Sequence, residues 1–417
     1  MPPLRVAFLL PTFPELANTF ILNQITGLVE RGHEVSLFAV SQKPLEGAAP
    51  EVARYHLAER LLHVPVPRAH LARLRSALRL LASPQGRHRA ALDALLPWHH
   101  GHRAWNLVQY HTAVSFLRAE RCDILHCQFG DHGPGAERLV RLSGRGTALI
   151  TSFRGADLTE SLEREPRRFA DLLHHGDLFM PVSDDFRRRL IAAGAPAERV
   201  EVHRSGIDLR RFQFAPRRPP QGRPHLLFVG RLTEKKGVTY LLDALALLRG
   251  SGRDVELRIV GEGPLELSLR AQCRSLALED CVQFSGALPH HEVTRLMQRA
   301  HLFVAPSVTA SSGDQEGIPN VLKEAMATGL PVVATWHSGV PELVEHGVSG
   351  FLAPERDATE LARCIETVLG DPLRWPALGL AGRRTVEAAY DAEQLNDRLV
   401  ESYRATIAAR SVRALRR

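Results

Sequence analysis

The stretch that decides the fold is SVTASSGDQEGIPNVLKEAMATGLPVVATW, residues 307–336. A polar loop runs to Glu316, and Pro319 then stands where proline suits the first turn of a helix. The apolar, β-branched run PVVAT at 331–335 has the composition of a buried strand. The segment therefore predicts a loop, a helix and a strand in succession, with carboxylates at Glu316 and Glu324 on either side of the helix start.

The same alternation extends over the whole second half of the chain. Apolar runs predict strands at 225–230, 255–261, 282–286, 302–307, 331–335 and 350–353. Helical spacing predicts helices at 236–250, 264–277, 290–300, 319–328 and 339–346. Strands joined by helical crossovers form parallel sheets whose faces are covered by helices. We therefore expect a doubly wound α/β domain in this half.

The first half shows a second, independent alternation. Predicted strands lie at 5–11, 34–40, 123–129, 147–153 and 177–183, with a helix at 19–33 and a basic helical segment at 68–118. The fold class is therefore α/β, with two doubly wound, Rossmann-like domains that we expect to face each other across a cleft.

A change in composition marks the expected domain boundary. Residues 210–225 hold four prolines and five arginines but no acidic residue, which is typical of a linker. We predict domains at 1–212 and 225–390, a linker at 213–224, and a C-terminal helix at 391–417 that packs back on the first domain.

Composition indicates a soluble globular protein. Of the 417 residues, 44% are hydrophobic and 24% are charged, and no apolar run approaches the ~20 residues that span a bilayer. The apolar N-terminal run lacks a cleavage site and is interpreted as a core strand rather than a signal peptide. We expect a cytoplasmic protein. The five scattered cysteines are interpreted as core residues and not as a disulfide framework.

Basic residues gather in one segment. The net charge is +7, and the stretch from residue 68 to residue 110 contains seven arginines but only one acidic residue, Asp93. These arginines are Arg68, Arg73, Arg75, Arg79, Arg87, Arg89 and Arg103, and His102 lies among them. Such a segment indicates an anionic partner, for which a membrane surface, a lipid-linked pyrophosphate and nucleic acid are the alternatives. Few aromatic residues are interleaved and no nucleic-acid motif occurs. A solvated pair of basic helices remains the plain interpretation.

The chemistry is expected at the carboxyl ends of the second set of strands. The first of these loops is GRLTEKKG, residues 230–237, which contains Gly230, Arg231 and Lys236. The next loop, VGEGPL, contains Gly263. Two cations beside a helix N-terminus make a site for a diphosphate, and no Asp-x-Asp metal motif is near. We therefore predict an anion site here, with a solvated basic turn as the plain interpretation of this loop alone.

The opening stretch adds the rest of this site. Gly317 lets backbone approach a ligand, and the amides of Gly317, Ile318 and Asn320 are expected to face an anion. Glu324 falls one turn into the helix, where a carboxylate can accept hydrogen bonds from vicinal ribose hydroxyls. Glu316 remains in the loop, nearer the outer end of the same ligand.

These motifs resemble those of the retaining, nucleotide-sugar-dependent glycosyltransferases of family four, which have the GT-B fold. The resemblance rests on GRLTEKKG, VGEGPL, EGIPNVLKEAMATGLPVVAT, HRSGIDLRRF and SGVPELVEHGVSGFLA, and it covers nearly the whole chain. The N-terminal pattern TFP…TFILNQ is similar to the branch that builds exopolysaccharides of the colanic-acid kind.

The resemblance implies a role for each matched residue. Arg231 and Lys236 would hold the donor diphosphate and stabilise the leaving group, and Glu324 would bind the ribose. Glu316 would bind hydroxyls of the transferred sugar, while Gly317 and Ile318 would donate backbone hydrogen bonds. The first domain would bind the acceptor and the second the nucleotide sugar. No cofactor and no metal are implied.

One segment departs from the family pattern. Where relatives often have a histidine near the donor sugar, TSFRGADL has Arg154, which is followed by Asp157. An arginine cannot act as a base at neutral pH, although it can contact a diphosphate or a sugar hydroxyl. We treat Arg154, Asp157, Thr19 and His126 as candidate contacts to the sugar or acceptor.

The resemblance therefore implies transfer of a hexose, with retention, from a nucleotide sugar to a saccharide or lipid-linked acceptor in exopolysaccharide or cell-surface glycan synthesis. Peripheral attachment to the inner face of the membrane is a hypothesis that follows from the basic segment. Two alternatives keep the fold, namely a nucleotide-sugar epimerase and a phosphorylase. A phosphorylase would need a lysine carrying pyridoxal phosphate, for which the sequence offers no candidate. The alternative of another class is a basic nucleic-acid-binding protein.

Overall fold

The computed structural model describes residues 2–14, 19–45, 48–63, 66–67, 69–101 and 104–415, so Arg68, His102 and Arg103 of the basic segment lie outside the described residues. The chain divides into two compact units. The first unit comprises the chain up to Pro181, Arg187–His203 and everything from Asn396 on, and the second comprises Val182–Phe186 and Arg204–Leu395.

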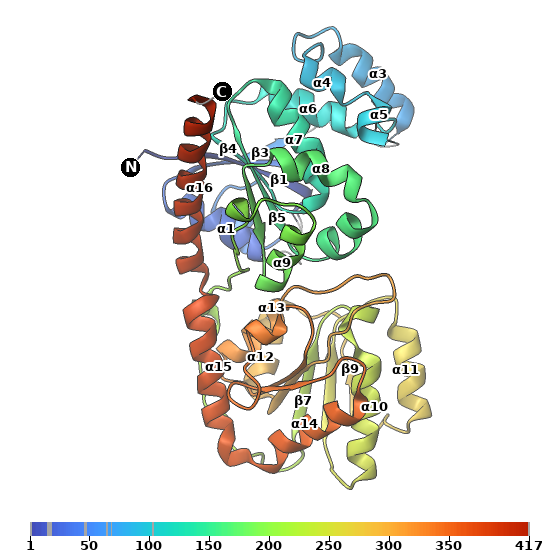
Figure 1. The fold of residues 1–417 in the computed structure, drawn as a ribbon. Coiled ribbons are helices and arrows are strands. Elements are labelled where there is room, and N and C mark those ends of the chain that lie inside the picture. Colours follow the sequence, from blue (N-terminus) through green and yellow to red (C-terminus); the bar gives the residue numbers. More distant parts are fainter. Residues whose placement is uncertain are drawn as a thin grey trace. The chain divides into compact units, whose positions relative to one another are not determined.

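The first unit contains a parallel sheet of six strands in the order β3-β2-β1-β4-β5-β6 (Figure 1). Its strands are β1 (Arg5–Phe13), β2 (Glu34–Gln42), β3 (Leu61–His63), β4 (Ile124–Cys127), β5 (Ala148–Phe153) and β6 (Leu178–Pro181). Every residue of β4 and β5 is buried, as expected for strands covered on both faces.

The helices of this unit include α1 (Thr19–Glu30), α2 (Pro50–Arg54), α3 (His70–Leu80), α4 (Arg89–Asp93), α5 (Pro97–His100), α6 (Val108–Arg118), α7 (Gly133–Ser143) and α8 (Pro166–His175). Helix α9 (Asp184–Ala192) belongs to it from Arg187 on. The basic segment expected at 68–118 is therefore divided among α3, α4, α5 and α6. Gly101 has a φ of 56° at the end of α5, and Leu107 has a φ of 59° before α6, so the backbone changes direction at both places.

The second unit repeats the design with a parallel sheet in the order β12-β11-β10-β7-β8-β9 (Figure 1). Its strands are β7 (His225–Val229), β8 (Glu256–Val260), β9 (Val282–Phe284), β10 (Leu302–Ala305), β11 (Val332–Thr335) and β12 (Phe351–Ala353). Each strand lies within a segment predicted from the sequence.

Its longer helices are α10 (Val238–Gly250), α11 (Glu266–Ser275), α12 (His290–Arg299), α13 (Asn320–Ala327), α14 (Ala358–Gly370), α15 (Trp375–Ala389) and α16 (Ala392–Leu415), the last of which continues into the first unit. The helix predicted at 339–346 is wrong, because only the short 3-10 turn Val340–Glu342 forms there. Pro341 fits that turn, and Glu345 N–H donates to Ser349 Oγ at 2.9 Å, so the chain turns instead of continuing a helix.

Both sheets have the same Rossmann strand order, and each contains one topological switch point. It lies between β1 and β4 in the first unit and between β7 and β10 in the second. Ligands of open parallel sheets bind outside the carboxyl ends of the strands at such points. The expectation of two doubly wound, Rossmann-like α/β domains is confirmed.

The division between the units falls between His203 and Arg204, so the segment 213–224, predicted as the linker, lies inside the second unit. Arg217 explains the difference. Its side chain is only 6% exposed, and Nη2 donates to Met297 O at 2.8 Å and to Thr328 Oγ1 at 3.1 Å. The composition of segment 213–224 correctly indicated irregular backbone, but irregular backbone can be anchored within a domain.

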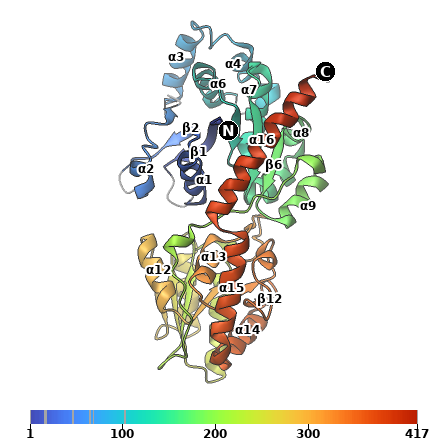
Figure 2. The ribbon, with the colours of Figure 1, turned by 90° about the vertical axis from the view of Figure 1, so that its left-hand side faces the viewer.

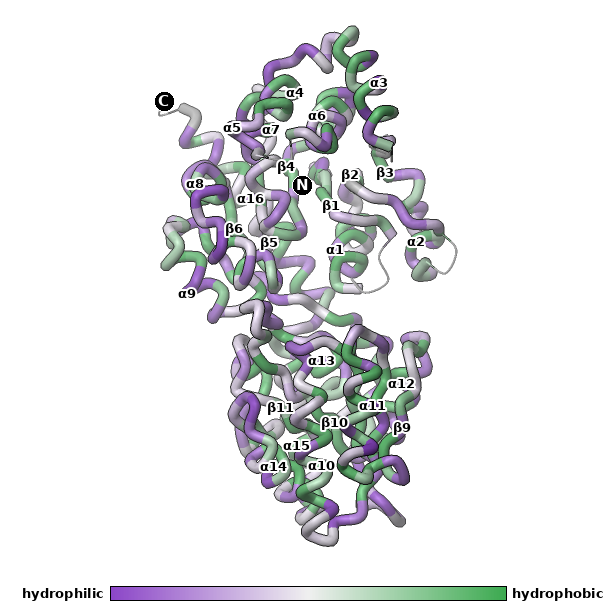
Figure 3. The backbone as a smooth tube through the Cα atoms, turned by 90° about the vertical axis from the view of Figure 1, so that its right-hand side faces the viewer, coloured by the Kyte–Doolittle hydropathy of each residue, from purple (hydrophilic) through white to green (hydrophobic). Residues whose placement is uncertain are grey.

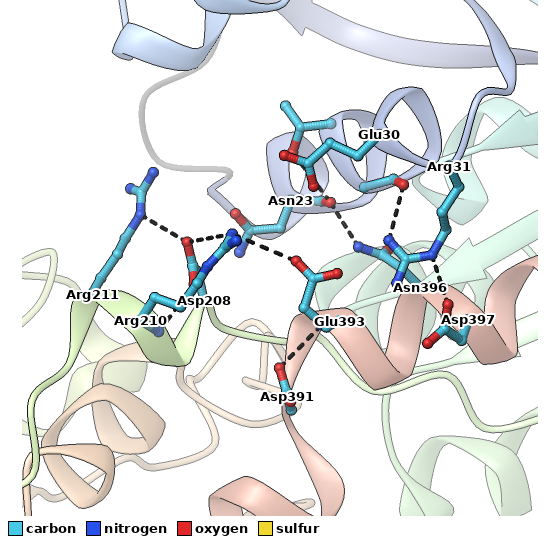
Figure 4. Close-up of polar contacts among 12 residues, drawn as sticks. Asn23, Glu30, Arg31, Asp208, Arg210, Arg211, Asp391, Glu393, Asn396 and Asp397 are labelled. Atoms are coloured by element: carbon cyan, nitrogen blue, oxygen red, sulfur yellow. Dashed lines mark hydrogen bonds and ion pairs between the residues drawn. The ribbon is translucent and has the colours of Figure 1, made fainter.

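From Asn396 on, α16 belongs to the first unit, where it lies along α1 (Figure 2). Asn396 Nδ2 donates to Asn23 O at 3.0 Å, and Arg31 Nε donates to Asp397 Oδ1 at 2.7 Å (Figure 4). A Cβ on Gly27 would come within 1.9 Å of the Asn396 side chain, so α1 must carry glycine at this contact.

The five cysteines are free, and four of them are buried. In the part of the chain that the structure describes, no helix combines the length and the apolar composition needed to span a bilayer.

Candidate active site

Two loops of the second unit meet at its switch point, and three consecutive side chains join them. These side chains belong to the turn Glu234–Lys236, which follows β7, and each one binds the loop 306–319, which follows β10. Glu234 accepts from Ser311 N–H at 2.9 Å, and Lys235 Nζ lies 2.9 Å from Asp314 Oδ2. Lys236 Nζ lies 2.5 Å from Glu316 Oε1. The turn therefore holds the β10 loop along its length.

The pair of Lys236 and Glu316 lies largely out of solvent. The two side chains are 15% and 13% exposed, respectively. Burial raises the pKa of Glu316, but the charge and hydrogen bond of Lys236 outweigh burial, so this pKa lies below its ordinary value. Ser307 Oγ also donates to Glu316 Oε2 at 3.1 Å. Glu316 is therefore an ionised carboxylate at neutral pH.

Arg231 differs from Lys236 in being exposed, and within the described residues its guanidinium has no protein partner. It follows Gly230, whose N–H donates to Val260 O at 2.9 Å. Near Arg231, the hydroxyl of Thr233 is buried and also lacks a partner among the described groups. A free cation beside a buried hydroxyl without a partner is the arrangement expected where a ligand completes the hydrogen bonding.

The loop after β8 approaches the loop after β7 closely, and this requires glycine. Gly261 has a φ of 132°, and a Cβ there would come within 1.9 Å of Gly230 O. A Cβ on Gly263 would come within 2.5 Å of Leu232 O. The two glycines therefore fix where Gly230 and Arg231 leave the sheet.

A buried histidine supports the backbone of Glu316. Glu316 N–H donates to His337 Nε2 at 3.1 Å, and His337 Nδ1 lies 2.5 Å from Glu355 Oε1. Because Nε2 accepts, the ring proton must lie on Nδ1, where it bonds the carboxylate. Glu355 also accepts from Thr309 N–H at 2.7 Å. Burial raises the pKa of Glu355, but the hydrogen bonds from Thr309 and His337 lower it by more. The pKa therefore lies below its ordinary value.

Helix α13 begins beside this loop. Its first N–H groups have no partner within the helix, and the buried Gly317 lies three residues before its first residue, Asn320. The Asn320 side chain is directed elsewhere, because its Oδ1 accepts from Lys323 Nζ at 2.8 Å and the same ammonium donates to Ser205 O at 2.8 Å. A ligand contact through the Ile318 and Asn320 amides therefore stays a prediction, whereas the Asn320 side chain is structural.

Glu324 lies on α13 and is 5% exposed. Its Oε1 lies 3.4 Å from His290 Nε2, and this hydrogen bond raises the pKa of His290 above its ordinary value despite the opposing effect of burial. His290 begins α12, which follows β9. Glu324 thus retains oxygen atoms that can accept hydrogen bonds near the switch point.

Arg154, in the first unit, is bound by neighbouring protein groups. Its Nη2 donates to Gln128 Oε1 at 2.8 Å and to Gln24 Oε1 at 3.2 Å, and its guanidinium lies 4.5 Å from the centre of the Phe20 ring. Burial lowers the pKa of Arg154 to about 10, so it is still charged at neutral pH. These partners come from α1 and from the segment that follows β4, while Arg154 itself follows β5.

The side chains of Asp157 and His126 are both hydrogen-bonded to other groups of the protein. Asp157 accepts from the N–H groups of Gly130 at 2.8 Å and Gly155 at 2.7 Å, which fixes the loop after β5. His126 is 0% exposed, with Tyr403 Oη 2.7 Å from Nδ1 and Ser152 Oγ 2.8 Å from Nε2. Burial holds the pKa of His126 well below its ordinary value. Neither side chain presents a free group to a ligand.

Thr19 is the first residue of α1 and is partly exposed. It follows β1 along the chain and so lies near the carboxyl edge of the first sheet. The structure thus gathers the second-unit candidates at one switch point, while the first-unit candidates divide into a buried group and an accessible N-terminus of α1.

Sequence reasoning missed His337, Glu355 and His290. Each follows a strand of the second sheet, so the rule that ligands bind at the carboxyl edge contained the signal for all three. Within the described residues, no group of three His, Cys, Asp or Glu side chains could hold a metal ion. The chemistry that this arrangement can perform is the binding of an anion by Arg231 and Lys236 beside two carboxylates, Glu316 and Glu324.

Two family descriptions match consecutive parts of the chain. Glycosyltransferase Family 4 matches residues 17–211, and Glycosyl transferases group 1 matches residues 210–385. WcaL of Salmonella typhimurium, named as a colanic acid biosynthesis glycosyltransferase, is 37% identical over 363 residues, which cover 86% of this chain and 89% of the relative. AmsK of Erwinia amylovora, named as an amylovoran biosynthesis glycosyltransferase, is 34% identical over 393 residues, which cover 93% of this chain and 96% of the relative.

A solved structure agrees with these relatives. Anabaena HepE in complex with UDP aligns with a TM-score of 0.71 at 18% identity, covering 96% of this chain and 100% of HepE. That likeness shows a shared fold, and the sequence relatives show the family. The chain belongs to glycosyltransferase family 4 and is a glycosyltransferase of the GT-B fold.

Proposed function

We propose that the chain transfers a hexose, with retention of configuration, from a nucleotide sugar to a saccharide or lipid-linked acceptor during exopolysaccharide synthesis. The observation that carries the proposal is the site at which Lys236 pairs with Glu316 at 2.5 Å while Arg231 remains free. The similarity to WcaL and AmsK supports the exopolysaccharide setting, because both relatives are named for that role. HepE, which was solved with UDP and with UDP-glucose, supports a nucleoside diphosphate as the leaving group.

The proposed chemistry follows from charge. As the bond between the sugar C1 and the diphosphate oxygen breaks, negative charge grows on that oxygen and positive charge grows on the sugar. Cations and amides already fixed in place stabilise such charge without reorganisation, which is usually the largest catalytic contribution. Arg231, Lys236 and the first amides of α13 would act on the diphosphate. Glu316 would bind hydroxyls of the departing sugar, and Glu324 would bind the ribose.

Rival reactions on the same fold predict different products. An epimerase would change the nucleotide sugar without an acceptor, and a phosphorylase would release a sugar phosphate. Purified protein should be incubated with UDP-glucose, UDP-galactose or GDP-mannose and a lipid-linked saccharide acceptor, and the products analysed by mass spectrometry. The proposal expects an acceptor heavier by one hexose together with free UDP or GDP. Epimerised donor or sugar phosphate without a heavier acceptor would refute it.

Transfer is proposed to need neither a metal nor a cofactor, because protein cations and helix amides can neutralise the diphosphate. Treatment with EDTA should leave the initial rate of transfer unchanged. A rate that falls with EDTA and returns with Mg²⁺ or Mn²⁺ would contradict metal-free transfer while leaving the identity of the reaction intact.

The first unit is proposed to contribute the acceptor site and to attach to an anionic membrane. The support for attachment is α3, along which hydrophobic and hydrophilic residues alternate (Figure 3). Leu71, Leu74 and Leu78 are 72%, 44% and 60% exposed, and Ala77 is the only buried residue that the helix contributes. Arg75 and Arg79 are also exposed. An exposed apolar face flanked by cations is the feature of helices that lie in a membrane interface.

Vesicle binding tests this attachment. Leu71→Gln combined with Leu78→Gln should weaken sedimentation with vesicles that contain phosphatidylglycerol, because it removes exposed apolar surface from α3. Leu267→Gln combined with Leu373→Gln is the matched control, since those leucines are 83% and 86% exposed in the second unit. Equal loss in both double variants, or wild-type protein that does not sediment at low salt, would refute attachment through α3.

A further inference from the structure

Two adjoining hollows lie in the first unit, with volumes of about 460 Å³ and 420 Å³. Side chains that both hollows share form the wall between them. The shared lining residues are His100, Gln109, Gly135 and Arg138. Each volume falls within the range typical of sites for small organic ligands, about 300–1,000 Å³.

The hollows lie where the fold places ligands. Asp131 and Gly135 follow β4 and line the first hollow, which also contacts Leu9 of β1. These two strands flank the switch point of the first sheet. The N-terminal turn of α8, which follows the loop after β5, supplies Arg167 and Arg168 to the second hollow. Both hollows are therefore lined by segments that follow the carboxyl ends of parallel strands.

A fixed polar cluster forms part of the shared wall. Arg138 Nε and Nη2 donate to the two oxygens of Asp93 at 2.8 Å and 2.7 Å, and Asp93 also lies 3.0 Å from His100 Nε2. The Asp93 and His100 side chains are 9% and 6% exposed, so the cluster is held within the protein. Such a cluster offers donors and acceptors in fixed directions.

Gln109 provides an observation that points to a ligand. Its side chain lines both hollows, and Oε1 is buried with no hydrogen-bond partner in the described part of the chain. A buried acceptor without a partner lowers the stability of the fold unless a donor binds to it. A hydroxyl group of a ligand bound in either hollow would be a suitable donor to Gln109 Oε1.

We propose that these hollows bind sugar units of the acceptor, with Trp98 as a stacking surface and Gln109 Oε1 accepting from a hydroxyl. This inference rests on the proposed function, because it identifies the acceptor site of that reaction. Trp98 lines the second hollow and is 74% exposed, so the indole is available to the apolar face of a pyranose ring. The many alanines of the first hollow leave the space unobstructed.

The charges of the lining favour a neutral saccharide over a phosphate. The lining of the two hollows contains three arginines and four carboxylates, so its net charge would repel a phosphate. The arginines are Arg138, Arg167 and Arg168, and the carboxylates are Asp93, Asp131, Glu165 and Asp171. Arg168 is itself paired, with Nη1 lying 3.2 Å from Glu165 Oε2 and 3.4 Å from Asp131 Oδ1. Paired charges of this kind provide hydrogen bonds to hydroxyls without strong attraction for anions.

Saturation-transfer NMR on the full chain tests the proposal, with the methyl glycosides of glucose, galactose, mannose and fucose as probes. Wild-type protein should bind at least one of them, and Trp98→Ala and Gln109→Ala should bind it about tenfold more weakly. Trp105→Ala is the matched control, because Trp105 is 69% exposed in the same segment but lines neither hollow. Thermal melting checks that each variant is folded.

The outcomes are distinct from those of the proposed function. If no glycoside binds wild-type protein, or if Trp98→Ala binds as Trp105→Ala does, the saccharide site is refuted. Inorganic phosphate that competes with the glycoside in wild-type protein but not in Trp98→Ala would assign the hollows to an anion instead and would also overturn the proposal. Thermal stabilisation by UDP or GDP should be equal in all variants, and its absence from wild-type protein would count against the proposed function alone.

Discussion

Lys236 Nζ lies 2.5 Å from Glu316 Oε1, so the cation and the carboxylate neutralise each other when no ligand is bound. A donor diphosphate would compete with Glu316 for Lys236. Binding would then free the carboxylate to accept hydrogen bonds from the sugar. In the proposed reaction, this one ion pair would thus link recognition of the phosphate to recognition of the sugar.

Removal of Lys236 should slow transfer strongly. Lys236→Ala is expected to lower kcat by about 10²–10³-fold, the cost of removing one fixed donor from a developing oxyanion. Lys235→Ala is the matched control, because the neighbouring Lys235 binds Asp314 at 2.9 Å and not Glu316. Steady-state kinetics with a nucleotide sugar would measure both variants. Equal rates for the two would show that the pairing of Lys236 with Glu316 has no special role.

The contribution of Glu316 to stability should depend on pH. Lys236 and neighbouring cations hold the folded-state pKa of Glu316 below its ordinary value, in spite of burial. A depressed carboxylate pKa stabilises the fold above the unfolded pKa, about 4.3, and this stability is lost as pH falls through the folded pKa. Urea unfolding should therefore show wild-type protein to be more stable than Glu316→Gln at pH 7, with the difference shrinking below about pH 4. A difference independent of pH would contradict the ion pair.

His337 should position Glu316 rather than contact substrate. His337→Ala leaves the Glu316 N–H without its acceptor and removes one donor from the Glu355 carboxylate, which keeps the Thr309 N–H, so the free energy of unfolding should fall by about 1–3 kcal/mol. Glu355→Gln keeps an oxygen that can accept from His337 and should lose less. The kinetic readout is kcat, which should fall in His337→Ala while the KM for the donor changes little. An unchanged kcat in a destabilised His337→Ala would make the histidine purely structural.

The hydrogen bond between His290 and Glu324 should be visible by NMR titration. Glu324 raises the pKa of His290, so the histidine should titrate above about 6.5, and Glu324→Gln should bring it back toward that value. The stability from this contact is present below the unfolded pKa and is lost as pH rises through the folded pKa. If ribose hydroxyls bind Glu324, added UDP or GDP should also lower the pKa of His290. A His290 pKa that responds to neither change would separate Glu324 from the nucleotide.

The fold was predictable because buried parallel strands occur in the sequence as continuous apolar runs. LFVA at 302–305 and VVAT at 332–335 are completely buried in the structure. The boundary between the units was not predictable from composition, since proline and arginine indicate irregular backbone whether or not it is anchored. Arg217 is such a case, because its contacts to Met297 and Thr328 come from residues distant in sequence.

The site was predictable only where residues lie in contiguous motifs. Lys236 and Glu316 stand in recognisable motifs, but their direct contact depends on the neighbouring positions of β7 and β10. His126 was a candidate because a histidine near a strand end can contact a ligand. In the structure, Tyr403 of α16, which is distant in sequence, is hydrogen-bonded to one of its ring nitrogens. Side chains brought from distant segments therefore decide which candidates remain free.

The most direct test of the central claim is a crystal structure of the full chain soaked with UDP or GDP. We predict that the diphosphate lies within hydrogen-bond distance of Arg231 and Lys236, with the ribose hydroxyls on Glu324. A nucleotide bound elsewhere, or one whose phosphates contact neither cation, would contradict the account.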